Sequence, residues 1–220
     1  MYRRVRDRFY TARDAPRAQE FAIKLARNYP TGRNWRDAIV MQREFGRPPA
    51  ELALAGYRLQ RAANALEGEG DYVSYAELLR SGGYPGEAKA VAEAGIAAGA
   101  FTRQRQGVPE LMRWADENVA RDRAGLDREA RDARAGTDAR VALRVGDALY
   151  GYGRYTEAAD LYRVALTKPG ANRDQINLHL GAALAMANQR AEAEAAFRAV
   201  SGTSASLASL WLAWLGRSQG

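Results

Sequence analysis

The feature that most constrains the fold is a small residue that recurs every 35 positions along the chain. Five of the six positions in this register are alanine: Ala18, Ala53, Ala88, Ala158 and Ala193, with Arg123 at the sixth. Four residues later stand Ala22, Tyr57, Ala92, Asp127, Tyr162 and Phe197, of which three are aromatic. A small residue followed one helical turn later by a bulky one lets two helices approach closely. A repeat of this length is typical of stacked helical hairpins.

A second helix is predicted before each of these. Its bulky register holds Phe9, Leu79, Trp114, Leu149 and Leu184, and a small-residue register holds Ala76, Gly146 and Gly181. Turn residues fall between the two helices at Gly82-Gly83, at Gly151 with Gly153, and at Asn188. Others fall between the units, in NYPTGR, LEGEGD, TKPGAN and SGTS. The pattern therefore predicts helical hairpins joined by short turns.

Composition agrees with an all-helical protein and leaves its compartment open. Hydrophobic residues make up 47% of the chain and charged residues 27%, and alanine is far more common than the β-branched residues. The chain has no cysteine, which excludes disulfides, thiolate metal sites and a cysteine nucleophile. The longest apolar stretch, SLASLWLAWLG, is about half of the roughly 18 residues that a membrane helix needs.

The net charge of +7 permits attraction to nucleic acid, anionic lipid or acidic peptides without requiring any of them. Almost all of the positive charge is arginine, with lysine only at Lys24, Lys89 and Lys168. Segments such as RDRAGLDREARDAR alternate in sign, which indicates a solvated helix face and not a basic tail.

At this point the chain resembles the tetratricopeptide repeat family. The best copy matches that family's pattern through Val145, Gly146, Leu149, Gly153, Tyr155, Glu157, Ala158, Tyr162, Ala165 and Pro169. The next copy matches through Leu180, Gly181, Leu184, Glu192, Ala193 and Phe197, and the first through Phe9, Ala18, Ala22, Leu25 and Pro30. Residues 35–66 and 108–135 match poorly, and helical hairpins are still expected there. The segment that begins NWRDAIVMQ, followed by GDYVSYAELLRSGGYPGEAKAV, also resembles bacterial proteins of this class that are commonly exported.

The resemblance implies an all-α, right-handed superhelical solenoid of helix-turn-helix hairpins that spans residues 1–220. The expected units are 1–33, 34–68, 71–100, 106–136, 139–172 and 174–202, followed by a capping helix at 204–216. The first unit begins within a helix at Tyr2, and MYRRVRDRFY is no signal peptide. The chain is therefore expected to be a fragment or a processed form. Removal of an upstream export signal would place it in the bacterial periplasm or outside the cell; otherwise the cytoplasm is expected.

Candidate catalytic features are few. Gly151-Tyr152-Gly153 resembles the start of a phosphate-binding loop, but Thr156 replaces the third glycine and the preceding residues have a helical pattern. His179 is the only histidine and lacks a second ligand at helical spacing, so a surface or hairpin-contact role is expected. No serine stands in a nucleophile-elbow setting. The sequence predicts no enzyme, no cofactor and no metal site.

The resemblance implies a partner-binding groove on the concave face, lined by the first helix of each unit. The implied groove residues are Arg3, Asp7, Tyr10, Val73, Glu77, Arg80, Arg140, Leu143, Asp147, Tyr150, Gln175 and Leu178. Such a mixed surface of arginine, tyrosine and apolar residues suits an extended peptide or a partner helix. The family's carboxylate-clamp subtype is excluded, because Leu143, Asp147 and Leu178 replace its lysine and asparagine residues.

The expected function is a non-catalytic scaffold that binds a peptide or partner protein on this face. One alternative is a basic helical-repeat protein that binds nucleic acid; another is an accessory domain of a larger protein. The apolar helix containing WLAWL is expected to cap the last unit or to pair two chains as a homodimer.

Overall fold

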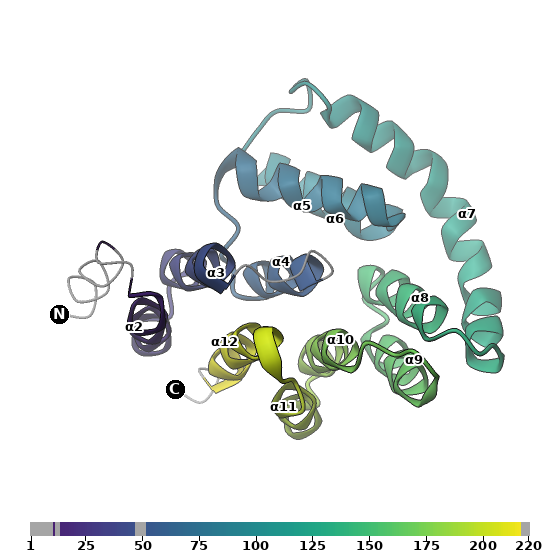
Figure 1. Ribbon diagram of the computed structural model, residues 1–220. Helices are drawn as coiled ribbons and strands as arrows, with labels where there is room; N and C mark the ends of the chain where they lie inside the picture. The colour runs from purple at the N-terminus through teal and green to yellow at the C-terminus, as the bar shows by residue number, and fades with distance from the viewer. Residues whose placement is uncertain (1–10, 12–13, 47–51, 217–220) are drawn as a thin grey trace.

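The computed structural model describes residue 11 and residues 14–46 and 52–216 (Figure 1). This part of the chain is helical and contains no strand. The α-helices are α2 (Ala15–Asn28), α3 (Gly32–Gly46), α4 (Ala53–Ala62), α5 (Gly68–Gly82), α6 (Pro85–Ala97), α7 (Val108–Ala135), α8 (Ala139–Gly151), α9 (Tyr155–Thr167), α10 (Arg173–Met186), α11 (Arg190–Arg198) and α12 (Ala205–Gly216). The expected all-α class is confirmed. Arg3, Asp7 and Tyr10 lie outside the described residues.

Among the described helices, none combines the length and the apolar character that a bilayer crossing requires.

The C-terminal helices form the hairpins that the small and bulky registers predict. A methyl group added at Gly146 of α8 would lie 2.5 Å from the ring of Tyr162 on α9. In the next hairpin, a methyl group at Gly181 of α10 would lie 2.5 Å from the ring of Phe197 on α11. Both aromatic rings are fully buried. Glycine therefore admits each ring at a point where any side chain would overlap with it.

The stretch around Gly151 and Gly153 is a turn between helices, as predicted. The helix α8 ends at Gly151, and α9 begins at Tyr155. Gly153 has a φ of 76°, in the left-handed region that glycine adopts without steric cost. The amide of Arg154 then donates to the carbonyl of Leu149 over 3.0 Å. These contacts end one helix and start the next, and they leave no phosphate-binding loop.

The expected hairpin within residues 106–136 is wrong, because α7 is one continuous helix of 28 residues. Between Pro109 and Ala135 the only glycine is Gly125 and there is no proline, and an isolated glycine costs a helix only about 1 kcal/mol. The lack of helix-breaking residues in this segment therefore outweighs the 35-residue period. The first half of α7 packs on α5 and α6, and its second half packs on α8 and α9, so α7 joins two hydrophobic cores (Figure 1).

The two ends of the described chain meet. The helix α12 packs on α11, as a capping helix would, and also on α2 and α3 (Figure 1). The indole nitrogen of Trp211 donates to the carbonyl of Ala55 over 3.3 Å, and the Gln42 amide donates to the Ser206 hydroxyl over 3.1 Å. The apolar face of α12 is thereby covered within one chain, with Leu207, Leu210 and Trp211 buried.

Candidate functional site

The structure buries four of the residues that were expected to line a concave groove. Leu143, Asp147, Tyr150 and Leu178 are each less than a tenth exposed. The expectation that they face an open groove is wrong, because α4 packs against α10 and its Arg58 guanidinium lies 3.8 Å from the centre of the Tyr150 ring. The covering helix is far away in sequence, so the repeat pattern gives no sign of it.

The other described members of the predicted groove remain at least partly exposed and are scattered. Val73, Glu77 and Arg80 lie on α5, Arg140 lies near the start of α8, and Gln175 lies near the start of α10. Arg80 pairs with Glu77 over 2.9 Å. These residues are carried by three helices, and of them only Arg80 lines the open groove described below.

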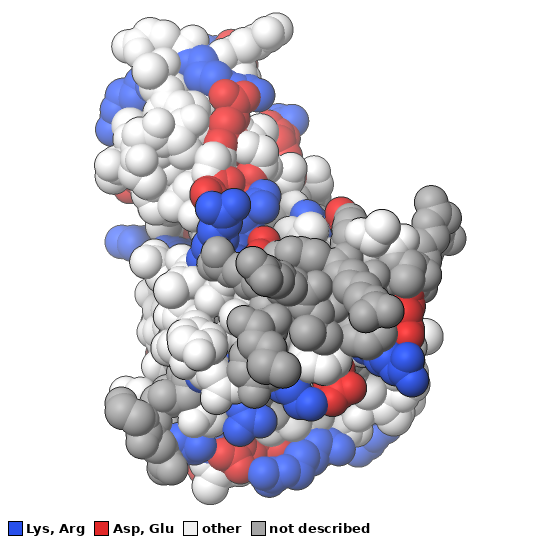
Figure 2. Space-filling model, turned by 90° about the vertical axis from the view of Figure 1, so that its left-hand side faces the viewer, with Lys and Arg blue, Asp and Glu red and all other residues white. Residues whose placement is uncertain are grey.

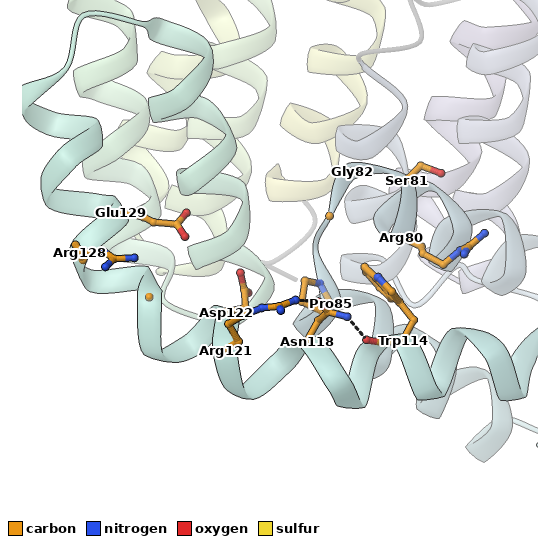
Figure 3. A pocket seen from close by; sticks show the side chains of 12 residues that line it. Arg80, Ser81, Gly82, Pro85, Trp114, Asn118, Arg121, Asp122, Arg128 and Glu129 are labelled. Carbon is orange, nitrogen blue, oxygen red and sulfur yellow. Dashed lines mark hydrogen bonds between the residues drawn. The ribbon is translucent and has the colours of Figure 1, made fainter.

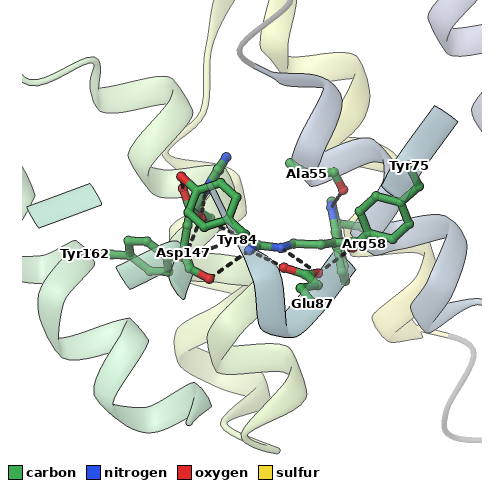
Figure 4. A network of polar contacts seen from close by, with 9 residues as sticks. Ala55, Arg58, Tyr75, Tyr84, Glu87, Asp147 and Tyr162 are labelled. Carbon is green, nitrogen blue, oxygen red and sulfur yellow. Dashed lines mark hydrogen bonds and ion pairs between the residues drawn. The ribbon is translucent and has the colours of Figure 1, made fainter. Parts of the chain in front are cut away.

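A cluster of charged groups occupies the covered face, with Arg58 of α4 at its centre (Figure 4). The Arg58 guanidinium donates to Glu87 of α6 over 2.8 and 3.3 Å. It donates to Asp147 of α8 over 2.6 Å. All three side chains are nearly inaccessible to water, with Arg58 only 1% exposed. One arginine thus joins three helices that are distant in sequence.

The two carboxylates also accept hydrogen bonds from tyrosine hydroxyls. Asp147 accepts from the Tyr162 hydroxyl over 2.8 Å and from the Tyr84 hydroxyl over 3.3 Å. Glu87 accepts from the Tyr75 hydroxyl over 2.5 Å. Saturating a buried carboxylate with donors in this way offsets part of its loss of hydration.

His179 of α10 completes the cluster. Its Nδ1 lies 2.7 Å from an Asp147 oxygen, so Nδ1 carries the proton, since an ionised carboxylate only accepts. The side chain is 1% exposed, so of the two expected roles the surface one is wrong, whereas a contact between helices agrees with the packing of His179 on the Tyr162 ring of α9. Its Nε2 is buried without a hydrogen-bond partner in the described structure, which costs about 1–3 kcal/mol.

Electrostatics inside the cluster favour fixed ionisation states. Burial by itself raises the pKa of Asp147, but Coulombic attraction and hydrogen bonds from His179 and Arg58 outweigh it and hold that pKa well below its usual range. Burial opposes the charge of Arg58, yet Glu87 and Asp147 raise its pKa well above the ordinary value. Burial and the neighbouring carboxylate raise the pKa of Tyr162 as well. Because these side chains are hydrogen-bonded to one another and nearly inaccessible to solvent, the cluster holds together helices that are distant in sequence.

Sequence reasoning missed Arg58 and Glu87. Arginine and glutamate are rarely fully buried, and nothing local to either residue marks it as an exception. Asp147 was included only as a groove residue. The residues that contact Asp147 come from α4, from the turn between α5 and α6, from α9 and from α10, so only the folded arrangement brings them together.

An open groove lies elsewhere, between α7 and the turn that joins α5 to α6 (Figure 3). Its volume is about 550 Å³. The lining residues are Arg80, Ser81, Gly82, Gly83, Pro85, Trp114, Asn118, Arg121, Asp122, Gly125, Arg128 and Glu129. Figure 3 shows the α7 side chains along one wall and the residues of the turn along the other. Two separate elements therefore build this surface.

The acidic residues of the groove are held by partners from the neighbouring hairpin. Asp122 accepts a hydrogen bond from the Tyr152 hydroxyl over 2.6 Å, and partial burial raises the pKa of Asp122. Glu129 lies 3.4 Å from the guanidinium of Arg144 on α8. Both carboxylates are thus already engaged in contacts with α8 or the residue that follows it.

The arginines of the groove are less fully compensated. Arg121 donates to the side-chain oxygen of Asn118, which carries no charge. Arg128 is exposed and makes no ion pair within the described residues. Arg80 pairs with Glu77, and both of these side chains are more than two-fifths exposed. The groove therefore presents a surplus of positive charge.

The described residues contain no group of three or more His, Asp or Glu side chains arranged to hold a metal ion. The groove lining has arginine, asparagine, carboxylate and tryptophan side chains and one hydroxyl, Ser81, and it includes no histidine. These charged, hydrogen-bonding and aromatic groups can contact a complementary ligand. Family models, curated proteins and solved structures were each compared with the chain, and none of the three comparisons gave a match.

Proposed function

We propose that this chain is a non-catalytic protein-interaction module, a tetratricopeptide-like solenoid that binds a segment of a partner protein. The single observation that carries this proposal is the groove between α7 and the α5–α6 turn. It supersedes the concave face of α8 and α10 as the candidate binding surface, because α4 and the Arg58 cluster fill that face.

The dimensions of the groove suit an extended peptide. A volume of 550 Å³ falls within the usual range of binding sites, about 300–1,000 Å³. Its α7 wall runs from Trp114 to Glu129, which corresponds to about 22 Å of helix. An extended peptide of about seven residues covers that length. Half-buried Trp114 supplies an apolar wall beside the polar groups.

Nucleic acid is the less favoured ligand. A phosphate backbone needs a run of cations, whereas Asp122 and Glu129 interrupt the arginines along the groove. Figure 2 shows another face, where Lys and Arg lie beside Asp and Glu over most of the coloured surface, with several positive side chains along its lower edge.

Because the chain has no cysteine, a single introduced cysteine is the only thiol that a crosslinking reagent can label. Ser81→Cys places one thiol at the rim of the groove, and Ala195→Cys places one on the exposed side of α11 as the matched control. Each variant is labelled with a photoreactive maleimide and irradiated in an extract of the source cells. The expected result is a discrete partner crosslinked at position 81 and absent at position 195.

That partner is then purified and titrated against the unlabelled protein by calorimetry. Direct binding that is weakened by a bulky label at position 81, and unaffected by the same label at 195, supports the proposal. Equal crosslinking at both positions, or a purified partner that binds regardless of either label, contradicts it.

A further inference from the structure

We propose that the α7 groove selects acidic segments, in which carboxylates pair with Arg121 and Arg128. This inference deepens the proposed function and rests on it. It commits to one class of partner, a protein segment rich in Asp or Glu.

The charge state of the groove wall is the first argument. Arg121 is hydrogen-bonded to a neutral amide, and Arg128 has no ion pair in the described part of the chain. The two arginines are seven residues apart on α7, which is about two helical turns, so they lie on the same side of the helix. An extended acidic segment along α7 would meet one and then the other.

The position of the acidic residues is the second argument. The Asp122 carboxylate is half-buried against the Tyr152 hydroxyl, and the Glu129 carboxylate is directed to Arg144 of α8. Since these contacts already engage both carboxylates, their repulsion toward an incoming acid is weakened. A basic segment would have to break these contacts to reach them.

The geometry of the guanidinium group suits a carboxylate. Arginine presents two parallel N–H donors that match the two oxygens of a carboxylate.

Tyr152 acts as a positioning residue beside the groove. Its ring occupies the space next to Gly86 at the start of α6, and its hydroxyl donates a hydrogen bond to Asp122. The Arg123 guanidinium lies 4.8 Å from the centre of the same ring and helps to fix it.

The test uses four fluorescein-labelled probes of equal length and the full chain. They are a peptide of Glu-Gly-Ser repeats, a peptide of Gln-Gly-Ser repeats, a peptide of Lys-Gly-Ser repeats, and an oligothymidylate. Binding is measured by fluorescence anisotropy at low and at physiological ionic strength. The acidic peptide is expected to bind most tightly and to weaken as salt screens the arginines.

Two double variants with the same net charge separate the groove from the general charge of the protein. Arg121→Gln with Arg128→Gln alters the groove, whereas Arg163→Gln with Arg198→Gln alters exposed arginines on α9 and α11. The groove variant is expected to bind the acidic peptide about tenfold more weakly. The control variant is expected to bind it within about twofold of the wild type.

Several results would overturn the inference. They are equal binding of the acidic and basic peptides, an equal loss in both double variants, no binding of the acidic peptide at low salt, or tighter binding of the oligothymidylate. The crosslinking result separates the proposed binding of a partner at the groove from the proposed selection of acidic segments. A partner at position 81 combined with indifference to peptide charge rejects acidic selection alone, and no partner at position 81 rejects the proposed function as well.

Discussion

The Arg58 cluster and the α7 groove are built from the same types of side chain in opposite surroundings. In the cluster, one guanidinium is enclosed by Glu87 and Asp147, and every charged group is shielded from water. In the groove, Arg121 and Arg128 face solvent without a carboxylate partner among the described residues. The cluster sits where distant helices converge, and the groove lies where α7 stands apart from the α5–α6 turn.

The difference shows what burial does to an arginine. A buried guanidinium that loses its partners is left with an uncompensated charge, so the folded state depends on the whole set. An exposed guanidinium is hydrated and contributes little to stability, and it is therefore available for recognition. Mutations in the Arg58 cluster should therefore change stability, and mutations in the α7 groove should change binding.

The largest effect is expected for Arg58→Met. It leaves Glu87 and Asp147 buried without their shared cation, and we expect a loss of about 3–5 kcal/mol in the free energy of unfolding. Urea denaturation followed by circular dichroism measures it. The control Arg163→Met, at an exposed arginine, should change stability by less than about 0.5 kcal/mol. Similar losses of unfolding free energy in both variants would contradict the claim that buried and exposed arginines contribute differently to stability.

The next effect concerns Asp147 and its dependence on pH. Because the folded-state pKa of Asp147 is lowered, its ionisation stabilises the fold above the unfolded value of about 3.9. That contribution is lost as the pH falls through the folded-state pKa. Asp147→Asn should therefore be about 2–3 kcal/mol less stable than the wild type at neutral pH. The gap should narrow in urea titrations at acid pH, and a gap that widened on acidification would contradict the assignment.

A smaller effect is expected for Gly146→Ala, which places a methyl group against the ring of Tyr162 and disturbs its hydrogen bond to Asp147. Overpacking of this kind costs about 1–3 kcal/mol. The matched control is Gly70→Ala on α5, where an added methyl group meets nothing within 4 Å. There we expect a gain of up to about 1 kcal/mol. Thermal unfolding of both variants tests the pair, and destabilisation by Gly70→Ala alone would refute the packing argument.

The smallest effect on stability is expected for the groove variant Arg121→Gln with Arg128→Gln. Both arginines lie at solvent-exposed positions of α7, so the free energy of unfolding should change by less than about 0.5 kcal/mol. Urea denaturation of the same preparation that is used for peptide binding measures it. A loss above about 2 kcal/mol would show that the groove arginines support the fold.

The sequence predicted the regular hairpins because their contacts are local. Gly146 and Tyr162 are close along the chain, and their sizes alone indicate how they pack. The sequence-based prediction was wrong at α7. The 35-residue register predicted two helices there, although Gly125 is the only glycine in that stretch and the helix is continuous. The prediction also failed for the inner face, because Arg58 reaches Asp147 from a helix 89 residues away. Contacts of that range are set by how helices stack, which a single sequence does not encode in any local pattern.

The groove could not be predicted from the sequence for the same reason. Arg80 was singled out, but for a different surface, while Trp114 was assigned only to a packing register. Their meeting depends on the continuous course of α7, and the sequence-based expectation had divided that helix.

The contact of α12 with α2 and α3 constrains how such a protein evolves. An open array of hairpins tolerates duplication or deletion of a unit, because each one touches only its neighbours. Here an inserted hairpin between α9 and α10 would carry α12 away from the N-terminal helices and withdraw Trp211 from Ala55. Relatives of this chain should therefore vary in loop length and surface residues while keeping the number of helices between α4 and α12 constant.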